Sequence, residues 1–131
     1  MMPLVLMFSA CSTKYPLELG KDYKLDYDGS SYFYILDANN TVIINSHITG
    51  FNFDSIFIIA EQKPIDLILQ ETYNNPKMDL KKRKKLFEES LLRLYWVINK
   101  NESQVYGPFK KEEYLQKRKE LGVPPELKLN E

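Results

Sequence analysis

Residue types that commonly perform enzyme chemistry are scarce in this chain of 131 residues. Its single cysteine is Cys11 and its single histidine is His47, whereas a zinc-type metal site needs several such ligands converging. Catalysis by a Ser–His pair would have to use His47, beside Ser46, and the sequence has no G-x-S-x-G motif to accompany it. Nor does it contain a Gly-rich phosphate loop. We therefore expect no catalytic residue, no metal and no cofactor, with His47 in a structural role.

An excess of one charge and long apolar runs are missing as well. The 18 basic and 18 acidic side chains give a net charge of zero, which argues against a dedicated nucleic-acid-binding domain, because such domains are strongly basic. No apolar segment reaches the roughly 20 residues of a membrane-spanning helix. An aromatic share of 13% with few glycines is typical of a folded chain, and 131 residues suit one domain with one core.

The two charge signs are nevertheless separated along the chain. Residues 1–75 contain four lysines and nine acids, whereas residues 76–131 contain fourteen Lys or Arg and nine acids. Such a division is found in proteins with two differently charged solvated faces and in proteins whose basic half binds an anionic partner. The sequence leaves both interpretations open.

The N-terminal segment pairs an apolar run with the lone cysteine. Residues 1–10 read MMPLVLMFSA, and Cys11 follows directly. Phe8-Ser9-Ala10-Cys11 resembles the lipobox of bacterial lipoproteins; no Lys or Arg precedes the run, and a start upstream of Met1 would explain this. The resemblance implies cleavage before Cys11, a diacylglyceryl thioether on its sulfur, and an extracytoplasmic protein anchored to a bacterial membrane through this lipid. The alternative is a buried N-terminal strand in which Cys11 packs as a small hydrophobic residue.

Downstream of this segment, alternating and apolar runs separated by short turns predict an antiparallel meander. Residues 12–22 are expected to be a tether, broken by Pro16 and Gly20. Around Gly50, residues 48–53 are expected to interrupt the strands. The four predicted strands are residues 23–28, 32–36, 41–45 and 55–60.

The C-terminal part of the chain carries the most definite local signals. Residues 95–98, YWVI, suit a pleated and partly buried surface, and after a polar loop the chain can return antiparallel over residues 104–106. A helix is expected to follow Pro108 and to end at Gly122, because Pro124-Pro125 prevents its continuation.

Two further helices are expected between residues 63 and 93. The first opens at Pro64, and Asp79 can cap the second, residues 80–92, whose apolar face would comprise Leu80, Phe87, Leu91 and Leu94. Together the elements predict one α+β domain over residues 23–131. We expect an antiparallel β-meander sheet of about five or six strands with two or three packed helices, preceded by a signal-peptide remnant and lipobox at residues 1–11.

The second of these helices departs from a rule of helix stability. Its first turn and a half, Lys81-Lys82-Arg83-Lys84-Lys85, is basic although the helix dipole favours acids there. Pairing of Lys84 with Glu88 and of Lys85 with Glu89 would offset part of the repulsion. Either the run is a solvated helix face, or Lys81, Lys82 and Lys85 contact an anionic surface such as phospholipid headgroups.

Three other groups of residues have two interpretations each. Asp22, Asp26 and Asp28 could bind a hard metal, but alternation places the last two on the solvent face of a strand. Ser55, after Asp54, resembles the acceptor of a short O-glycosylation motif of bacterial envelope proteins, and a serine at a strand start explains it as well. The aromatic residues form a core or, in part, an exposed patch for a peptide or glycan. They are Tyr23, Tyr27, Tyr32, Tyr34, Phe51, Phe53, Phe57, Tyr95 and Trp96.

Several short segments follow one another in a recognisable order. They are Ile58-Ile59-Ala60-Glu61-Gln62, Tyr95-Trp96-Val97-Ile98-Asn99 and Tyr106-Gly107-Pro108-Phe109, followed by Tyr114 and Leu121. With the lipobox, this order resembles a family of small bacterial lipoproteins that share a domain of unknown function, relative to which residues 63–93 are an insertion. The resemblance implies a fold and a location, and it adds no catalytic residue.

These observations predict a lipid-anchored bacterial envelope protein that binds a partner, such as an envelope protein, a peptide or a glycan. The alternatives are a small enzyme or inhibitor acting on cell-envelope polymers, and a structural spacer. A cleft that gathers two or more titratable groups with shifted pKa values would favour the enzyme. A surface with an exposed apolar patch would favour binding.

Overall fold

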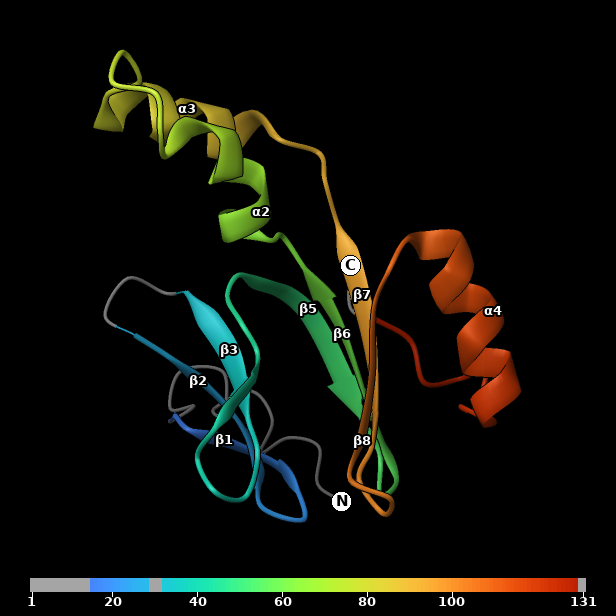
Figure 1. Ribbon diagram of the computed structural model, residues 1–131. Helices are drawn as coiled ribbons and strands as arrows, with labels where there is room; N and C mark the ends of the chain where they lie inside the picture. Colours follow the sequence, from blue (N-terminus) through green and yellow to red (C-terminus); the bar gives the residue numbers. More distant parts are fainter. Residues whose placement is uncertain (1–14, 29–31, 130–131) are drawn as a thin grey trace, which may run out of the picture.

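The strands of this protein pair into two antiparallel sheets. The computed structural model describes residues 15–28 and 32–129, and within them eight strands form two sheets of four (Figure 1). The first sheet contains β1 (Leu17–Gly20), β2 (Tyr23–Tyr27), β3 (Phe33–Leu36) and β4 (Val42–Ile44). The second contains β5 (Ile48–Phe53), β6 (Phe57–Gln62), β7 (Leu94–Asn99) and β8 (Gln104–Phe109). The predicted α+β class with antiparallel meanders is confirmed, although the strands are more numerous and divide into two sheets.

Strand β1 lies where a tether was expected. Lys21 and Asp22 both have positive φ, 50° and 68°, which is the geometry of a tight two-residue hairpin turn. The turn folds residues 17–20 back onto β2, and Leu19 becomes fully buried. This corrects the expected boundary, because the ordered pairing begins at Leu17 rather than at Tyr23.

Strand β5 occupies residues 48–53, where an interruption was expected. The pairing of β5 with β6 shifts register between Ile48 and Gly50 and then continues to Phe53. Glycine inside a strand pattern often marks such a bulge, because it tolerates the local bend. The expectation of a break was therefore wrong: Gly50 marks an irregularity within the strand.

The central strands of the second sheet, β6 and β7, are buried on both faces. Alternate residues of these strands point to opposite sides. On one side Ile58, Ala60 and Ile98 pack against Leu19, Leu25 and Ile35 of the first sheet. On the other side Phe57, Ile59, Tyr95 and Val97 pack against Tyr114, Val123 and Leu127. The molecule thus has three layers: the first sheet, the second sheet, and helix α4 with the C-terminal segment (Figure 1).

Helix α4 (Lys111–Leu121) ends at Gly122 as the sequence predicts, but it begins later than expected, because the strand before it continues to Phe109. The Lys110 amide donates to Glu113 Oε1 at 2.8 Å, and Gly122 ends the helix in the left-handed conformation with φ 79°. Strand β8 runs through Gly107 and Pro108 to Phe109, so these two residues lie inside the strand. No helix in the described part of the chain is both long and apolar enough to cross a membrane.

A buried lysine joins the two sheets. Lys100, which follows β7, is 3% exposed, and its Nζ donates to the carbonyl oxygens of Leu19 in β1 and Asp54 in the β5–β6 turn. Burial lowers the pKa of this ammonium, partly opposed by the Asp54 carboxylate. The two backbone acceptors satisfy a charge that would otherwise be expensive to bury.

Candidate functional site

A two-helix arm (residues 64–93) leaves the second sheet between β6 and β7. Helix α2 (Ile65–Leu69) continues into the short 3-10 helix η1 (Gln70–Thr72), and α3 (Leu80–Glu89) returns the chain to β7. In Figure 1 the arm projects beyond both sheets. Neither of the two core clusters formed by the described residues contains an arm residue.

Local hydrogen bonds hold the arm together. The Asp79 carboxylate caps α3 by accepting from the Lys82 amide at 2.8 Å, as the sequence predicts. The Arg83 guanidinium donates to the Thr72 carbonyl at 3.0 Å, and the Thr72 hydroxyl donates to the Leu69 carbonyl at 2.7 Å. Arg83 is therefore an internal link between the two halves of the arm.

The apolar side chains of α3 are left largely uncovered. None of the ten residues of the helix is buried, and Leu80 is 80% exposed. The expected apolar face is wrong in its extent and in its burial. The helix ends at Glu89, because Ser90 is already extended, so Leu91 lies beyond it. Leu91 is also 90% exposed. Phe87 alone among the predicted face residues within the helix is partly covered.

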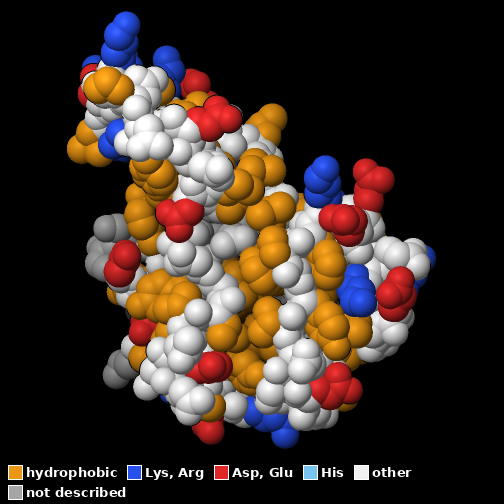
Figure 2. Space-filling model, viewed as in Figure 1, with side chains coloured by type: hydrophobic (Ala, Val, Ile, Leu, Met, Phe, Trp, Pro, Cys, Tyr) orange, Lys and Arg blue, Asp and Glu red, His pale blue; other side chains and the backbone are white. Residues whose placement is uncertain are grey.

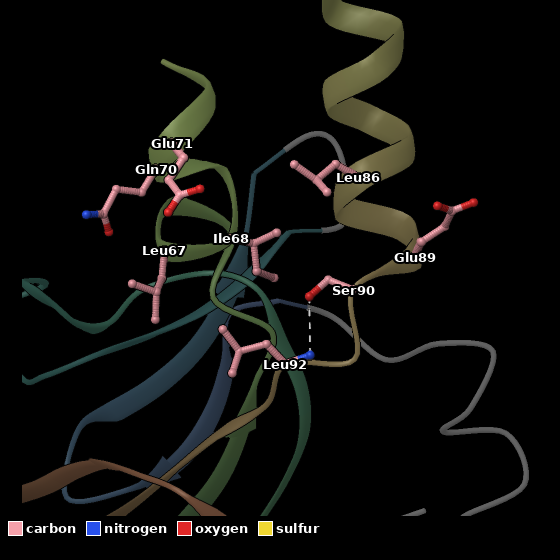
Figure 3. A pocket seen from close by; sticks show the side chains of 8 residues that line it. All are labelled: Leu67, Ile68, Gln70, Glu71, Leu86, Glu89, Ser90 and Leu92. Carbon is pink, nitrogen blue, oxygen red and sulfur yellow. Dashed lines mark hydrogen bonds between the residues drawn. The ribbon is translucent and has the colours of Figure 1, made fainter. Parts of the chain in front are cut away.

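A groove of about 480 Å³ runs between α2 and the end of α3. In Figure 3, side chains from α2, η1, α3 and the segment after α3 surround it. Its apolar lining is Leu67, Ile68, Leu86 and Leu92, and its polar lining is Gln70, Glu71, Glu89 and Ser90. The groove thus adds to the exposed apolar surface of the arm.

The basic run of α3 lies on the outside of the arm. Lys81, Lys82 and Lys85 are exposed, and Figure 2 shows Lys and Arg side chains beside hydrophobic ones at the end of the arm. Within the described residues, Lys117 and Glu120 form the one ion pair closer than 4 Å. The pairs expected for Lys84 and Lys85 with Glu88 and Glu89 therefore do not form. The lysine charges of the arm are left without acidic partners.

A cluster of basic side chains joins the base of the arm to the sheets. The His47 ring lies between the rings of Tyr32 and Phe87, with centroid distances of 4.4 and 5.4 Å. Lys63 Nζ donates to the Glu88 carbonyl at 3.2 Å and lies 4.5 Å from the centre of the Phe87 ring. These contacts pack His47 between the sheets and the arm, although its buried Nε2 has no hydrogen-bond partner among the described residues.

The pKa values of both titratable groups in this cluster are shifted. Burial lowers the pKa of His47, and the charges of Lys63 and Arg93 lower it further, against the opposing charge of Asp28. Burial, followed by the charge of Arg93, lowers the pKa of Lys63. Neither His47 nor Lys63 lines the arm groove. The shifted pair is therefore built into the packing between arm and sheet and does not face that groove.

A second hollow, the C-terminal cleft, lies beside α4 on the outer face of the second sheet. It has a volume of about 610 Å³ and is lined in part by Tyr95, Tyr114 and Leu115. Arg118 donates to the Tyr114 hydroxyl at 3.0 Å and to the Pro124 carbonyl at 2.8 Å. Burial raises the pKa of Tyr114, against the lowering effect of Arg118. Both side chains are engaged in holding the C-terminal segment to the helix.

The other predicted site residues do not assemble into a site. Cys11 and the lipobox lie outside the described residues. Ser55 is exposed in the turn between β5 and β6, before rather than within β6, and the Asp54 carboxylate organises this turn by accepting from the amides of Ile56 and Phe57 at 2.8 and 2.7 Å. Among the residues that the structure describes, no three His, Cys, Asp or Glu side chains are placed to hold a metal ion, so Asp22, Asp26 and Asp28 form no such group.

The aromatic residues divide between the two interpretations given above. Tyr23, Phe57 and Tyr95 are buried in the cores, whereas Tyr27 and Phe53 are exposed. The arm groove was not predicted, because its leucines come from separate segments and resemble core residues in the sequence. Their one visible signal is that they lie within residues 63–93, which we expected to be an insertion.

Comparisons with known proteins agree with one part of the resemblance noted in the sequence, the domain of unknown function. The family model described as "Protein of unknown function (DUF3997)" matches residues 21–131, a range that includes both sheets from β2 onward, the arm and α4. No curated protein and no solved structure matches the chain. The matched range covers well over half of the sequence, and the chain therefore belongs to the DUF3997 family of proteins of unknown function.

Proposed function

We propose that this protein is a lipid-anchored protein of the bacterial envelope that acts by binding, with the arm as its binding element. The observation that carries the binding role is helix α3, which buries none of its ten residues. Helices in proteins draw most of their stability from a packed apolar face, and α3 lacks one. Its exposed leucines and unpaired lysines are thus available to a partner.

The lipid anchor is supported by the motif Phe8-Ser9-Ala10-Cys11, and the packing of Tyr15 indicates which end of the domain a lipid on Cys11 would lie near. Tyr15 packs on Tyr27 and Phe33, with ring centroids 5.0 and 5.2 Å apart. The four residue steps from Cys11 to Tyr15 span at most about 14 Å when extended. A lipid on Cys11 would hold this end of the domain close to the membrane.

Lipid attachment is tested by metabolic labelling of the full chain behind a complete signal peptide. The wild-type protein should incorporate labelled palmitate and sediment with membranes. Cys11→Ser should incorporate none and should be released into the soluble fraction. Absence of label in the wild-type protein would contradict the anchor.

A crosslinking experiment in the same strain distinguishes a binding role of the arm from that of a structural spacer. Photo-crosslinking groups placed at Leu80 and at Leu91 should capture a membrane component, because both side chains are exposed on the arm. The matched control is Val42 on β4, which is also exposed but lies on the first sheet. Equal yields at all three positions would contradict a binding role for the arm.

A further inference from the structure

We propose that the arm lies on the anionic phospholipid headgroups of the membrane that carries the Cys11 lipid. Lys81, Lys82 and Lys85 would contact the headgroup phosphates, and Leu80 would enter the interfacial region beside them. This inference rests on the proposed lipid anchor and identifies the partner of the arm.

Charge is the first argument for an anionic surface. Residues 80–87 contain five Lys or Arg side chains and no acid, and Arg83 is directed inward to Thr72. The remaining lysines are exposed and without ion pairs, so their charge is not consumed within the fold. An exposed lysine close to an anionic bilayer contributes about fivefold to binding, equivalent to roughly 1 kcal/mol.

The placement of these charges at the wrong end of the helix is the second argument. The first turn of α3 has no acid and its last turn has no base, the reverse of what its dipole favours. The Asp79 carboxylate at the N-cap offsets only part of this cost, and a local rule that is broken without full compensation inside the fold indicates a requirement outside it. An anionic surface would add negative charge at this end of the helix.

Geometry is the third argument, because Tyr15 and the base of the arm lie near the same end of the first sheet. Tyr15 contacts Phe33, the first residue of β3. The preceding residue, Tyr32, contacts His47, which in turn contacts Phe87 of α3. Few contacts therefore separate the chain leading to Cys11 from the arm, and one membrane surface can meet both.

The charge of the remaining domain favours one orientation. Residues 15–44, which contain the first sheet, have five acids and two lysines, so an anionic surface repels most of that sheet. An exposed leucine next to the lysines adds apolar contact at the interface, as in other amphipathic segments that lie on membranes. The arm would touch the bilayer, and of the first sheet only the end beside Tyr15 would lie near it.

The test measures vesicle binding by the full 131-residue chain carrying Cys11→Ser, which cannot be lipidated. Vesicles of phosphatidylcholine are compared with vesicles containing one part phosphatidylglycerol to two parts phosphatidylcholine. Any association of residues 1–10 with lipid is common to both vesicle types, so the quantity of interest is the ratio of the two affinities. We expect a ratio of about a hundred or more at low salt, since three lysines contribute about fivefold each. The ratio should fall towards one in 1 M salt, where the screening length is about 3 Å.

Two charge-matched variants locate the contact. Lys81→Gln, Lys82→Gln and Lys85→Gln together should abolish the preference for anionic vesicles. Lys110→Gln, Lys111→Gln and Lys119→Gln remove the same charge from exposed positions around α4 and should leave the preference within about threefold of the parent chain. Thermal unfolding of both variants verifies that each is folded.

Several results would overturn the proposal. They are equal binding to both vesicle types, no binding to either, or a loss that is larger for the α4 variant than for the arm variant. Self-association of the chain without vesicles that Leu80→Ser removes would assign the arm to a second copy instead. Failure of palmitate labelling overturns the anchor alone, whereas anionic-lipid preference is measured without the lipid and succeeds or fails separately.

Discussion

Helices α3 and α4 are of nearly equal length and obey opposite rules. Helix α4 has Glu112 and Glu113 in its first turn and Arg118 and Lys119 in its last, and it buries Tyr114 against the second sheet. Helix α3 has no acid in its first turn, no base in its last and no buried residue. The charges named in α4 suit the helix dipole at both ends, whereas in α3 only the Asp79 cap does so.

This contrast separates the parts of the chain that maintain the fold from the part that is free to serve a partner. Every stabilising device found in α4 depends on contacts within the domain. The features of α3 that lack such contacts, its leucines and lysines, are those on which the proposed function rests. Mutations should therefore have opposite consequences in the two helices.

The largest effect on stability should come from removing the buried ring of α4. Tyr114 is 2% exposed, stacks on Tyr95 with a centroid distance of 5.2 Å, and accepts a hydrogen bond from Arg118. Tyr114→Ala should lower the free energy of unfolding by about 3–5 kcal/mol, as other large-to-small aromatic substitutions do. Denaturant titration of the wild-type protein and the variant measures this difference in the free energy of unfolding. Leu80→Ala in α3 is the control and should change stability by less than about 0.5 kcal/mol.

A slightly smaller loss of stability should come from a substitution in β7, just after the arm ends. Trp96 in β7 is half-buried, packs on the core between the sheets, and donates from Nε1 to Gln62 Oε1 at 2.8 Å. We expect Trp96→Ala to lower the free energy of unfolding by about 3 kcal/mol. Leu91, five positions earlier, is almost fully exposed, so Leu91→Ala should be neutral. Similar losses for both substitutions would place the boundary elsewhere.

The base of the arm should respond to pH. The pKa of His47 in the folded protein lies below its ordinary value of 6.5, because of burial and the nearby Lys63 and Arg93. The unfolded chain then binds the proton more strongly, so the contribution of His47 to stability is complete above pH 6.5 and is lost as the pH falls below it. Melting temperatures at pH 7.5, 6.5 and 5.5 should decrease in that order. His47→Gln should reduce this dependence, and parallel curves for the two proteins would contradict the role of His47.

The smallest effect should be a gain in stability. Lys81→Glu with Lys82→Glu places acids in the first turn of α3 and should raise the free energy of unfolding by about 0.3–1 kcal/mol for each substitution. Lys119→Glu, at the end of α4, should lower it by a similar amount. Chemical denaturation of the wild-type protein, the α3 variant and the α4 variant measures whether each substitution raises or lowers the free energy of unfolding. A loss of stability in the α3 variant would mean that its lysines are required by the fold.

The sequence predicts those parts of this fold that depend on neighbours along the chain. The cap at Asp79, the helix end at Gly122 and the hairpin around residues 99–103 follow from local backbone preferences and are confirmed. The division into two sheets does not follow, because it depends on which strands meet in space. The missed strand β1 depends on left-handed conformations at Lys21 and Asp22, which residues of these types adopt only in a suitable context.

Prediction of the site meets a similar limit. The basic run of residues 81–85 is visible in the sequence, and in the structure its four lysines are exposed. The apolar face predicted around it assumed that leucines at helical spacing must be buried. The same spacing describes a helix that exposes its leucines, and only the position of the arm outside both cores distinguishes the two. At Gly107 the constraint comes from a neighbouring strand. A Cβ there would lie 2.8 Å from Trp96 Cε3, and no local sequence pattern reveals this contact.

The way in which the arm is closed has a consequence for hydrogen exchange. Gln62 and Leu94 lie opposite each other in the β6–β7 ladder, so residues 63–93 form a loop whose ends the sheet holds together. Opening this loop breaks few contacts with either core, whereas opening β6 or β7 disrupts both. Amide protons of α3 should therefore exchange through local opening, far faster than those of the central strands. Any surface that covers the arm would slow exchange in α3 alone, which makes these amides a direct measure of its occupancy.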